Sequence, residues 1–371
     1  MGKMKKPKIS VIVSAYNAEK YIKKCLIALM EQTLRDIEVI CINDASSDDT
    51  LNIIKKTVDT DERFVIINNT KNIGVSKSRN IGIKNARADF VMFCDADDYY
   101  DESMCEEMYK AVAYSSRIDM GISEINVIYE AHREMKYSDD NYYSLKYAGI
   151  QKVNDDLILN TDLSPTNKIF KKKVILDNEI YFPENLYYED AYFCVAYFCC
   201  CKYVNFINDR LYNYIRHEKS TMSDTWSTDT EKDPAIDHLY IAFELFEFLK
   251  KKSLIDKYNE LYWNLFYSFE LFALSNSKTA SRKKRVKNEA SEFCKKNEVE
   301  LEKTPPYIKE KILSLNSSNA EINKIKIKRA LIRFMPTYRL QVENIQRLRG
   351  LKNNMAQLNE KVDSLSSRKN L

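Results

Sequence analysis

Glycine and histidine are scarce in this chain. There are six glycines and three histidines among 371 residues, so long flexible linkers are not expected, and the scattered histidines form no zinc signature. The most apolar stretch, residues 191–201, is about half the roughly 20 residues that a membrane-spanning helix needs. No apolar signal-peptide segment follows the basic start, because Pro7 leads directly into a predicted strand. We therefore expect a cytoplasmic protein.

Cysteine is present, but not in a pattern that indicates disulfides or a metal centre. The nine cysteines include no C-x-x-C pair, and an odd number without an export signal argues against a disulfide framework. The run at residues 199–201 lies in an apolar segment. Free cysteine packs as a small hydrophobic residue, so we expect this run to belong to a buried helix.

Strand-like and helical segments alternate over the first hundred residues. This alternation predicts a mainly parallel sheet covered by helices on both faces, an α/β fold. Ligands of such sheets bind beyond the carboxyl ends of the strands. Tyr16, Asp44 and the segment Asp95–Asp98 all follow predicted strands at those ends. The predicted strands are 11–13, 37–42, 64–67 and 90–94, and the predicted helices 18–30 and 75–86, with Ser46 or Ser47 capping another helix between them.

The fourth predicted strand ends in a group of acids. Asp95 and Asp97 point to the same side of an extended chain, and Asp98 follows them. Mg²⁺ takes few protein carboxylates and fills its other positions with water and substrate phosphates. These acids therefore favour a metal-dependent enzyme; the alternative is a solvated acidic turn.

Two further segments suit a nucleotide, although neither is specific alone. Asp44 closes the second predicted strand, and its carboxylate can accept a hydrogen bond from an N–H group of uracil or guanine. A helix cap is the alternative role of Asp44. Residues 72–80 supply a glycine turn, a helix start and Arg79; helix N-termini and the arginine fork both suit phosphate.

In combination, four segments resemble the family-2 inverting glycosyltransferases with the GT-A fold. They are residues 13–17 (VSAYN), 42–50 (INDASSDDT), 72–82 (NIGVSKSRNIG) and 93–98 (FCDADD). The resemblance is strong over about residues 7–100 and looser to about residue 225. It implies a Rossmann-like GT-A domain, a nucleotide-diphospho-sugar donor, Mn²⁺ or Mg²⁺, and sugar transfer with inversion at the anomeric carbon.

The same resemblance implies roles for individual residues. Ser14, Tyr16 and Asp44 would contact base and ribose, and Arg79 would lie near the diphosphate. Asp97 would be the principal metal ligand, with Asp95 on the ribose or on a metal-bound water. The nucleotide-binding set that we expect is Ser14, Tyr16, Asn17, Asp44, Arg79 and Asp95.

Inversion also requires a general base on the acceptor hydroxyl. The Glu189-Asp190 pair resembles the acidic pair of the family at the start of a helix under the acceptor site. We expect Asp190 to be the base and Glu189 a supporting acid, since adjacent carboxylates can raise one pKa to a useful value. The alternative is a helix N-terminus that carries acids because the helix dipole favours them there.

Two other elements are candidates for phosphate or acceptor contacts. Asn167 and Lys168 lie in a segment that resembles an acceptor-side segment of bacterial members of the family. Arg216 and His217 follow a tyrosine-rich strand, where such enzymes often carry a segment that closes on the diphosphate. Arg216 or His217 would contact the phosphates, or His217 the metal. A surface loop without a role is the alternative for this last pair.

The C-terminal part is helical in pattern and basic at its end. We expect a GT-A domain over residues 1–225, a helical domain over 226–320 and a tail over 321–371. The tail carries twelve basic and four acidic residues, whereas the rest of the chain has a net charge of −4. The apolar and basic face of residues 322–339 suits an anionic bilayer at the inner face of the cell membrane, or packing on the helical domain. Apolar residues from Leu348 to Leu365 step by three and four, as in a short coiled coil that would support a homo-oligomer.

The sequence thus predicts a bacterial-type glycosyltransferase that uses a UDP-sugar. The acceptor would be a growing surface glycan, free or lipid-linked, and no nucleic-acid partner is expected. A sugar nucleotidyltransferase is a rival, but it needs a glycine-rich basic loop after the first strand. Residues 14–19 there contain neither glycine nor a basic residue. A catalytically silent scaffold that binds nucleotide sugars is the other alternative.

Overall fold

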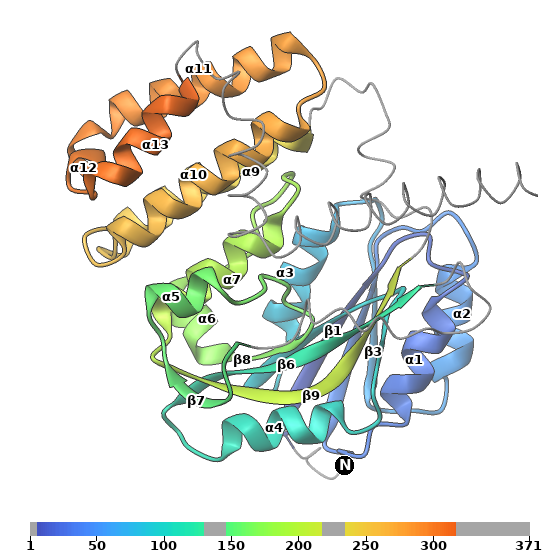
Figure 1. Cartoon of the computed structure of the whole chain (residues 1–371). Coiled ribbons are helices and arrows are strands. Elements are labelled where there is room, and N and C mark those ends of the chain that lie inside the picture. The colour runs from blue at the N-terminus through green and yellow to red at the C-terminus, as the bar shows by residue number, and fades with distance from the viewer. Residues whose placement is uncertain (1–5, 130–145, 217–233, 317–371) are drawn as a thin grey trace, which may run out of the picture. The chain divides into compact units, whose positions relative to one another are not determined.

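The computed structural model describes residues 6–129, 146–216 and 234–316 (Figure 1). The chain divides into two compact units, residues 1–317 and 318–371. The predicted basic face and the coiled-coil seam at 348–365 both fall in the second unit and lie outside the described residues. His217 belongs to the first unit and also lies outside the described residues.

The first half of the sheet consists of parallel strands with apolar sequences. Strands β1 and β2 are buried along almost their whole length, as expected for parallel strands covered on both faces. Strand β1 pairs with both β2 and β4, so their carboxyl ends meet at one edge of the sheet. The parallel strands are β1 (Ile9–Ala15), β2 (Ile37–Asn43), β3 (Phe64–Asn68) and β4 (Phe90–Asp95).

The second half of the sheet is mixed. The full order is β3-β2-β1-β4-β8-β6-β9-β5, with β7 on β9. Strand β8 runs antiparallel to both β4 and β6, whereas β6 and β9 pair in parallel. The α/β class predicted from the sequence is confirmed. These strands are β5 (Tyr99–Tyr100), β6 (Ile118–Tyr129), β7 (Gly149–Lys152), β8 (Lys168–Lys171) and β9 (Tyr203–Arg216).

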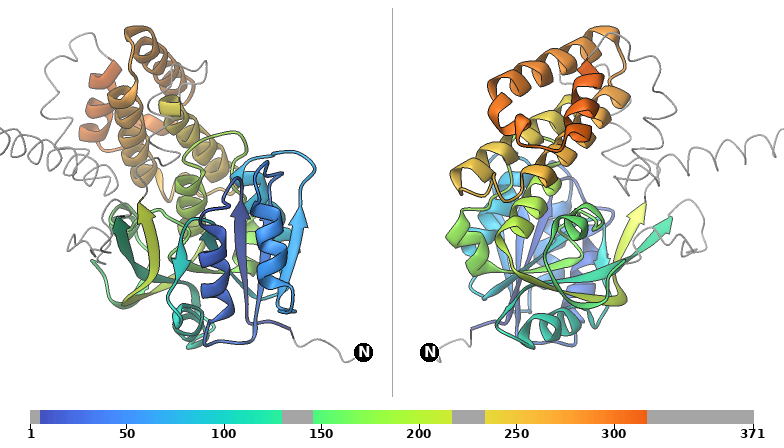
Figure 2. Two further views of the ribbon diagram at one scale, coloured as in Figure 1. Left: turned by 90° about the vertical axis from the view of Figure 1, so that its right-hand side faces the viewer. Right: turned by 60° about the vertical axis from the view of Figure 1, so that its left-hand side comes forward.

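Helices cover both faces of this sheet. Helices α1, α2 and α4 pack on the face that carries Val11 and Val13 (Figure 2). Helix α3 covers the opposite face, where Gly82 lies against Ile12 of β1, and α7 follows on that face with its buried aromatic residues. The helices are α1 (Ile22–Met30), α2 (Thr50–Val58), α3 (Val75–Asn85), α4 (Met104–Ala113), α5 (Asp155–Leu159), α6 (Lys172–Asn178) and α7 (Glu189–Cys200).

The described residues from 234 to 316 form helices joined by short connections. An aromatic core of Phe246, Trp263, Phe266 and Phe293 joins α9, α10 and α11, and α9 also packs on α7 (Figure 1). None of the described helices is both long and apolar enough to cross a membrane. The helices are α9 (Pro234–Lys251), α10 (Asn259–Asn276), α11 (Ala280–Lys296), α12 (Glu298–Glu302) and α13 (Pro306–Asn316).

Candidate active site

A buried arginine gathers three predicted site residues. Arg79, in the second turn of α3, is 4% exposed, and its guanidinium binds three carboxylates. Nη2 donates to Oδ1 of Asp95 at 2.9 Å, and Nη1 donates to Oε1 of Glu189 at 2.9 Å and to Oδ1 of Asp190 at 2.6 Å. The guanidinium therefore joins the end of β4 to the start of α7, more than ninety residues apart in sequence.

The segment before α7 is fixed on α3 by a reciprocal pair of hydrogen bonds. The Asn80 amide donates to the Phe182 carbonyl at 2.8 Å and accepts from the Phe182 N–H at 2.9 Å. The Phe182 ring lies 5.1 Å from the Arg79 guanidinium and stacks on Phe193 of α7 at 4.1 Å. Asn80 and Phe182 were not predicted as site residues, because nothing in the sequence near either residue indicates that they meet.

The electrostatics of the cluster separate Asp190 from its neighbours. Its side chain is 37% exposed, against 12% for Glu189. Desolvation raises the pKa of Asp190 to about 7; Arg79 opposes this rise, while Glu189 and Asp95 add to it. Burial also raises the pKa of Glu189. A carboxylate with a pKa near neutrality and an accessible edge is suited to accept a proton.

The three acids at and after the end of β4 have different surroundings. Asp97 is exposed, and the Asp95 side chain is 35% exposed. Asp98 is buried and accepts hydrogen bonds from the Tyr212 hydroxyl at 2.5 Å and the Ile215 N–H at 2.7 Å. Asp98 therefore ties the end of β9 to the segment that follows β4, and Asp95 and Asp97 are the acids that can meet a ligand.

Asp95 and Asp97 fit a hard divalent cation that is completed by substrate oxygens. Among the described residues, no group of three or more His, Cys, Asp or Glu side chains forms a metal cage. Mg²⁺ commonly uses one or two carboxylates plus substrate phosphates, so two accessible carboxylates at the end of β4 are an adequate protein contribution.

Four of the six predicted nucleotide-binding residues lie around the ends of β1 and β2. The Tyr16 ring is 51% exposed, whereas Ser14 is half-buried. Asp44 is 3% exposed, and its carboxylate accepts hydrogen bonds from the Asn69 amide and from the N–H groups of Ile73 and Gly74. In this structure Asp44 organises the loop that leads into α3.

Asn17 joins two loops at the same edge of the sheet. Its φ is 49°, in the left-handed region that asparagine tolerates better than most residues. Its side-chain oxygen accepts from the Ser47 N–H at 2.8 Å, and its own N–H donates to the Ser46 hydroxyl at 3.0 Å. The two serines expected to cap α2 instead bind Asn17, and Asp49 precedes the helix.

Asn167 and Lys168 are fully buried. The Lys168 ammonium donates to Asp162 at 2.9 Å, to the Ser164 carbonyl at 2.6 Å and to the Asn167 side chain at 2.8 Å. Both residues are 0% exposed, so in this structure they shape the loop before β8 and present no surface to an acceptor or phosphate.

Arg216 ends β9 beside the last residue of β6. Its guanidinium lies 5.9 Å from the Tyr129 ring and donates to the Tyr129 hydroxyl at 3.5 Å. This is the same edge of the sheet to which Asp98 ties Ile215. His217, the other member of the predicted pair, lies outside the described residues.

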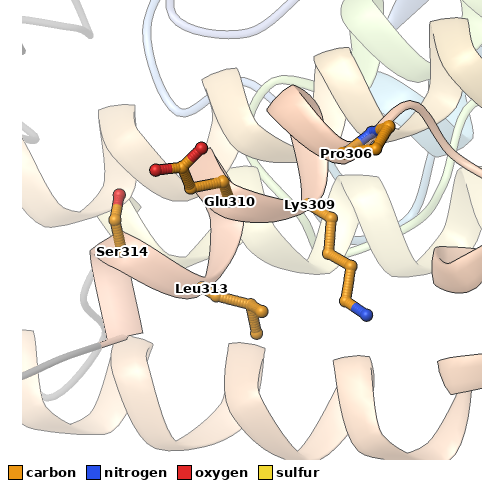
Figure 3. Close-up of a pocket in the computed structure, with 5 residues that line it drawn as sticks. All are labelled: Pro306, Lys309, Glu310, Leu313 and Ser314. Atoms are coloured by element: carbon orange, nitrogen blue, oxygen red, sulfur yellow. The ribbon is translucent and has the colours of Figure 1, made fainter.

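A surface pocket is lined by residues 306–314, which include none of the predicted site residues. Figure 3 shows that its lining comes from α13 alone, and it shares no residue with the Arg79 cluster. The lining residues are Pro306, Lys309, Glu310, Leu313 and Ser314.

Comparison with known protein sequences gives a consistent set of relatives. The family described as "Glycosyl transferase family 2" matches residues 10–177. Glycosyltransferase GlyA of Streptococcus pneumoniae is 28% identical over 231 residues, which cover 59% of this chain and 32% of GlyA. Poly(ribitol-phosphate) beta-N-acetylglucosaminyltransferase TarS of Staphylococcus aureus is 34% identical over 181 residues, 48% of this chain and 30% of TarS. The chain thus spans about a third of the length of these two relatives.

Solved structures agree on the fold. TarS residues 1–349 in complex with UDP-GlcNAc superpose with a TM-score of 0.55 at 23% identity, covering 76% of this chain and 83% of that one. Mannosyltransferase PcManGT from Pyrobaculum calidifontis, in complex with GDP-Man and Mn²⁺, gives 0.50 at 14% identity and covers 86% and 89%. At these identities the similarity concerns the fold.

Proposed function

Residues 10–177 belong to glycosyltransferase family 2 and have the GT-A fold, and we propose that the chain transfers a sugar, with inversion, from a UDP-sugar to a hydroxyl group of a bacterial surface glycan. The observation that carries this proposal is the Arg79 cluster. In it, the Arg79 guanidinium binds both Asp95, which is predicted to contact the nucleotide, and Asp190, the predicted general base.

The donor would bind at the carboxyl ends of β1, β2 and β4. The exposed Tyr16 ring offers a stacking face for the base. Asp44 would reach a base N–H once its loop contacts rearrange. When bound, Mn²⁺ or Mg²⁺ held by Asp97 and Asp95 would neutralise charge on the two phosphates as the nucleoside diphosphate departs.

The acceptor would bind at the start of α7. There Oδ2 of Asp190 would accept the proton of the acceptor hydroxyl. The acceptor oxygen would form the new bond to the anomeric carbon as the bond from that carbon to the nucleoside diphosphate breaks. Arg79 holds Oδ1 of the same carboxylate at 2.6 Å and thereby fixes its orientation. Glu189 shares the guanidinium and keeps it in place.

The choice of UDP and of a glycan acceptor draws on the relatives. The fold neighbour TarS is described in complex with UDP-GlcNAc, and the related TarS chain is named a poly(ribitol-phosphate) transferase. PcManGT is described with GDP-Man, so the base is the part of the proposal that needs a direct test.

A thermal-shift panel tests the donor side. The full chain would be melted with UDP, GDP, CDP, dTDP or ADP, each with and without Mn²⁺. We expect UDP to raise the melting temperature only with the metal, and Asp97→Ala to abolish that shift without changing the melting temperature of the free protein. A metal-dependent shift with another nucleotide would replace UDP, and no shift with any of them would favour a silent scaffold.

A further inference from the structure

The turn that carries the predicted base has an unfavourable backbone conformation. Tyr188 precedes α7 with a φ of 67°, in the left-handed region that tyrosine rarely adopts. The Tyr188 side chain makes no capping hydrogen bond to the helix. Glu189 and Asp190 follow directly, so the direction of both carboxylates depends on what holds this turn.

Helix α9 supplies contacts to this turn from beyond the residues that match the family. The Tyr187 N–H donates to Oδ2 of Asp237 at 3.0 Å. The His238 ring stacks on Tyr188 with ring centroids 3.4 Å apart and an angle of 22° between the planes. Both α9 residues are more than nine-tenths buried, so water does not compete strongly for these contacts.

The surroundings of His238 exclude a role for it in proton transfer. Both ring nitrogens are buried without a hydrogen-bond partner among the described residues. Burial lowers the pKa of His238 well below its ordinary value, so the ring is neutral. The Phe272 ring of α10 also contacts the His238 ring, with the two ring centroids 3.9 Å apart. His238 therefore acts on the turn through its ring surface.

We infer that Asp237 and His238 are positioning residues, through which helix α9 holds the Tyr187–Tyr188 turn so that Asp190 faces the acceptor. The inference rests on the proposed function, because it gives Asp190 the role of base. Asp237 fixes the backbone N–H three residues before Asp190, and His238 fixes the ring two residues before it. The helices after residue 233 thus complete the site formed by the family-2 domain.

Substitutions separate the hydrogen bond from the ring contact. Asp237→Ala removes the acceptor for Tyr187, whereas Asp237→Asn keeps an oxygen that can accept the same bond. His238→Ala removes the ring, whereas His238→Phe keeps it and replaces two unpartnered nitrogens with carbon. Lys251→Ala is the matched control, because it removes another contact of α9, the exposed ion pair with Glu179 at 2.8 Å.

Two measurements would be made on the full-length chain. Hydrogen exchange would follow the peptide that contains the Tyr187 amide. Release of UDP from UDP-glucose, UDP-galactose and UDP-GlcNAc would give kcat and KM for hydrolysis, with water in the place of the acceptor. Melting temperatures would show which variants fold.

We expect Asp237→Ala and His238→Ala to speed exchange at this peptide and to lower kcat by about tenfold or more, with KM changed less than about twofold, because a displaced base costs rate more than donor binding. Asp237→Asn, His238→Phe and Lys251→Ala should stay within about twofold of the wild type.

Other outcomes would overturn the inference. Unchanged exchange in Asp237→Ala would show that the bond to Tyr187 does not hold the turn. If Asp237→Asn lowers kcat as much as Asp237→Ala does, the hydrogen bond to the Tyr187 N–H is not what positions the base. If His238→Phe lowers kcat as much as His238→Ala does, the ring contact with Tyr188 is not what positions it. If Asp190→Asn hydrolyses at the wild-type rate, the base assignment of the proposed function fails, while the exchange result still decides the link between α9 and the turn.

Discussion

Arg79 determines the electrostatic character of the site. Its buried guanidinium faces three carboxylates, so one positive charge meets up to three negative charges and an excess of negative charge remains around Asp190. Removing one member of such a buried group is costly, because the partners are left without compensation. This arrangement allows a carboxylate with a raised pKa to sit in a fixed orientation.

The raised pKa of Asp190 predicts a pH dependence of the reaction. A base works only when deprotonated, so hydrolysis should be slow well below the pKa of about 7, rise with pH, and level off above it. In Glu189→Gln the neighbouring negative charge that raises this pKa is lost, so the midpoint should move to lower pH. The measurement is kcat/KM for hydrolysis across a pH series, because kcat/KM reports the pKa values of the free enzyme.

Two results would contradict this assignment. A kcat/KM profile without an inflection between about pH 5 and 8 would mean that another group limits the rate. A midpoint that moves to higher pH in Glu189→Gln would show that Glu189 lowers the pKa of Asp190, whereas repulsion between the two carboxylates should raise it.

At single residues, the sequence predicted which positions lie at the strand ends but not which of them are exposed. Asp97 and Asp98 are adjacent in the sequence, yet one is exposed and the other is bound to Tyr212. That difference depends on a strand that begins more than a hundred residues later. Lys168 is a similar case, because its burial depends on Asp162 and on a loop that closes around it.

Among the secondary-structure elements, α3 carries Arg79 and lies unusually close to the sheet. A Cβ at Gly82 would come within 2.9 Å of Cγ1 of Ile12 in β1. Overpacking a well-filled core costs about 1–3 kcal/mol. We expect Gly82→Ala to destabilise the fold by about this amount, measured by denaturant unfolding, and to displace Arg79 with its helix.

A double-mutant cycle provides the control for Gly82. Ile12→Ala removes the colliding side-chain carbons, so the double variant should lose less stability than the sum of the two single variants. Additive losses would show that the helix and strand do not meet at this point. Gly74 is a useful comparison, since no atom of the described residues lies within 4 Å of a Cβ added there and its φ of 87° is what disfavours a side chain.

The elements of the first hundred residues were predictable because apolar runs and helical periods alternate there. Strand β1 and helix α3 lie within a few residues of the predicted ranges. The order of β8, β6 and β9 in the sheet was not predictable, because these strands pair across long sequence separations. Helix α13 lies within the helical domain expected over residues 226–320, although its bounds were not predicted.

On the scale of the whole molecule, the charge is divided between the body and the tail. Residues 321–371 carry a net charge of +8, and we propose that they bind an anionic membrane surface and that the 348–365 seam supports self-association. Flotation with phosphatidylserine-containing liposomes should fall when five tail cations are replaced by glutamine, since each contributes about 1 kcal/mol. The five are Lys326, Lys328, Arg329, Arg333 and Arg339.

The control is a full-length variant with the same loss of charge elsewhere. Lys278, Lys283, Lys284, Lys295 and Lys296 are all exposed on or beside α11. Replacing these five with glutamine should leave flotation near the wild-type level. Equal losses in both variants would mean that net charge alone, and not the tail, determines membrane binding.

The most direct test of the account is the release of nucleoside diphosphate from nucleotide sugars by the wild type and by Asp190→Asn. In the presence of Mn²⁺, the wild type should hydrolyse one nucleotide sugar of a panel. Asp190→Asn should bind the corresponding nucleotide with unchanged affinity and lose at least about a hundredfold in kcat, the scale of general base catalysis. Hydrolysis at the wild-type rate by Asp190→Asn, or none by the wild type with any nucleotide sugar, would contradict the account.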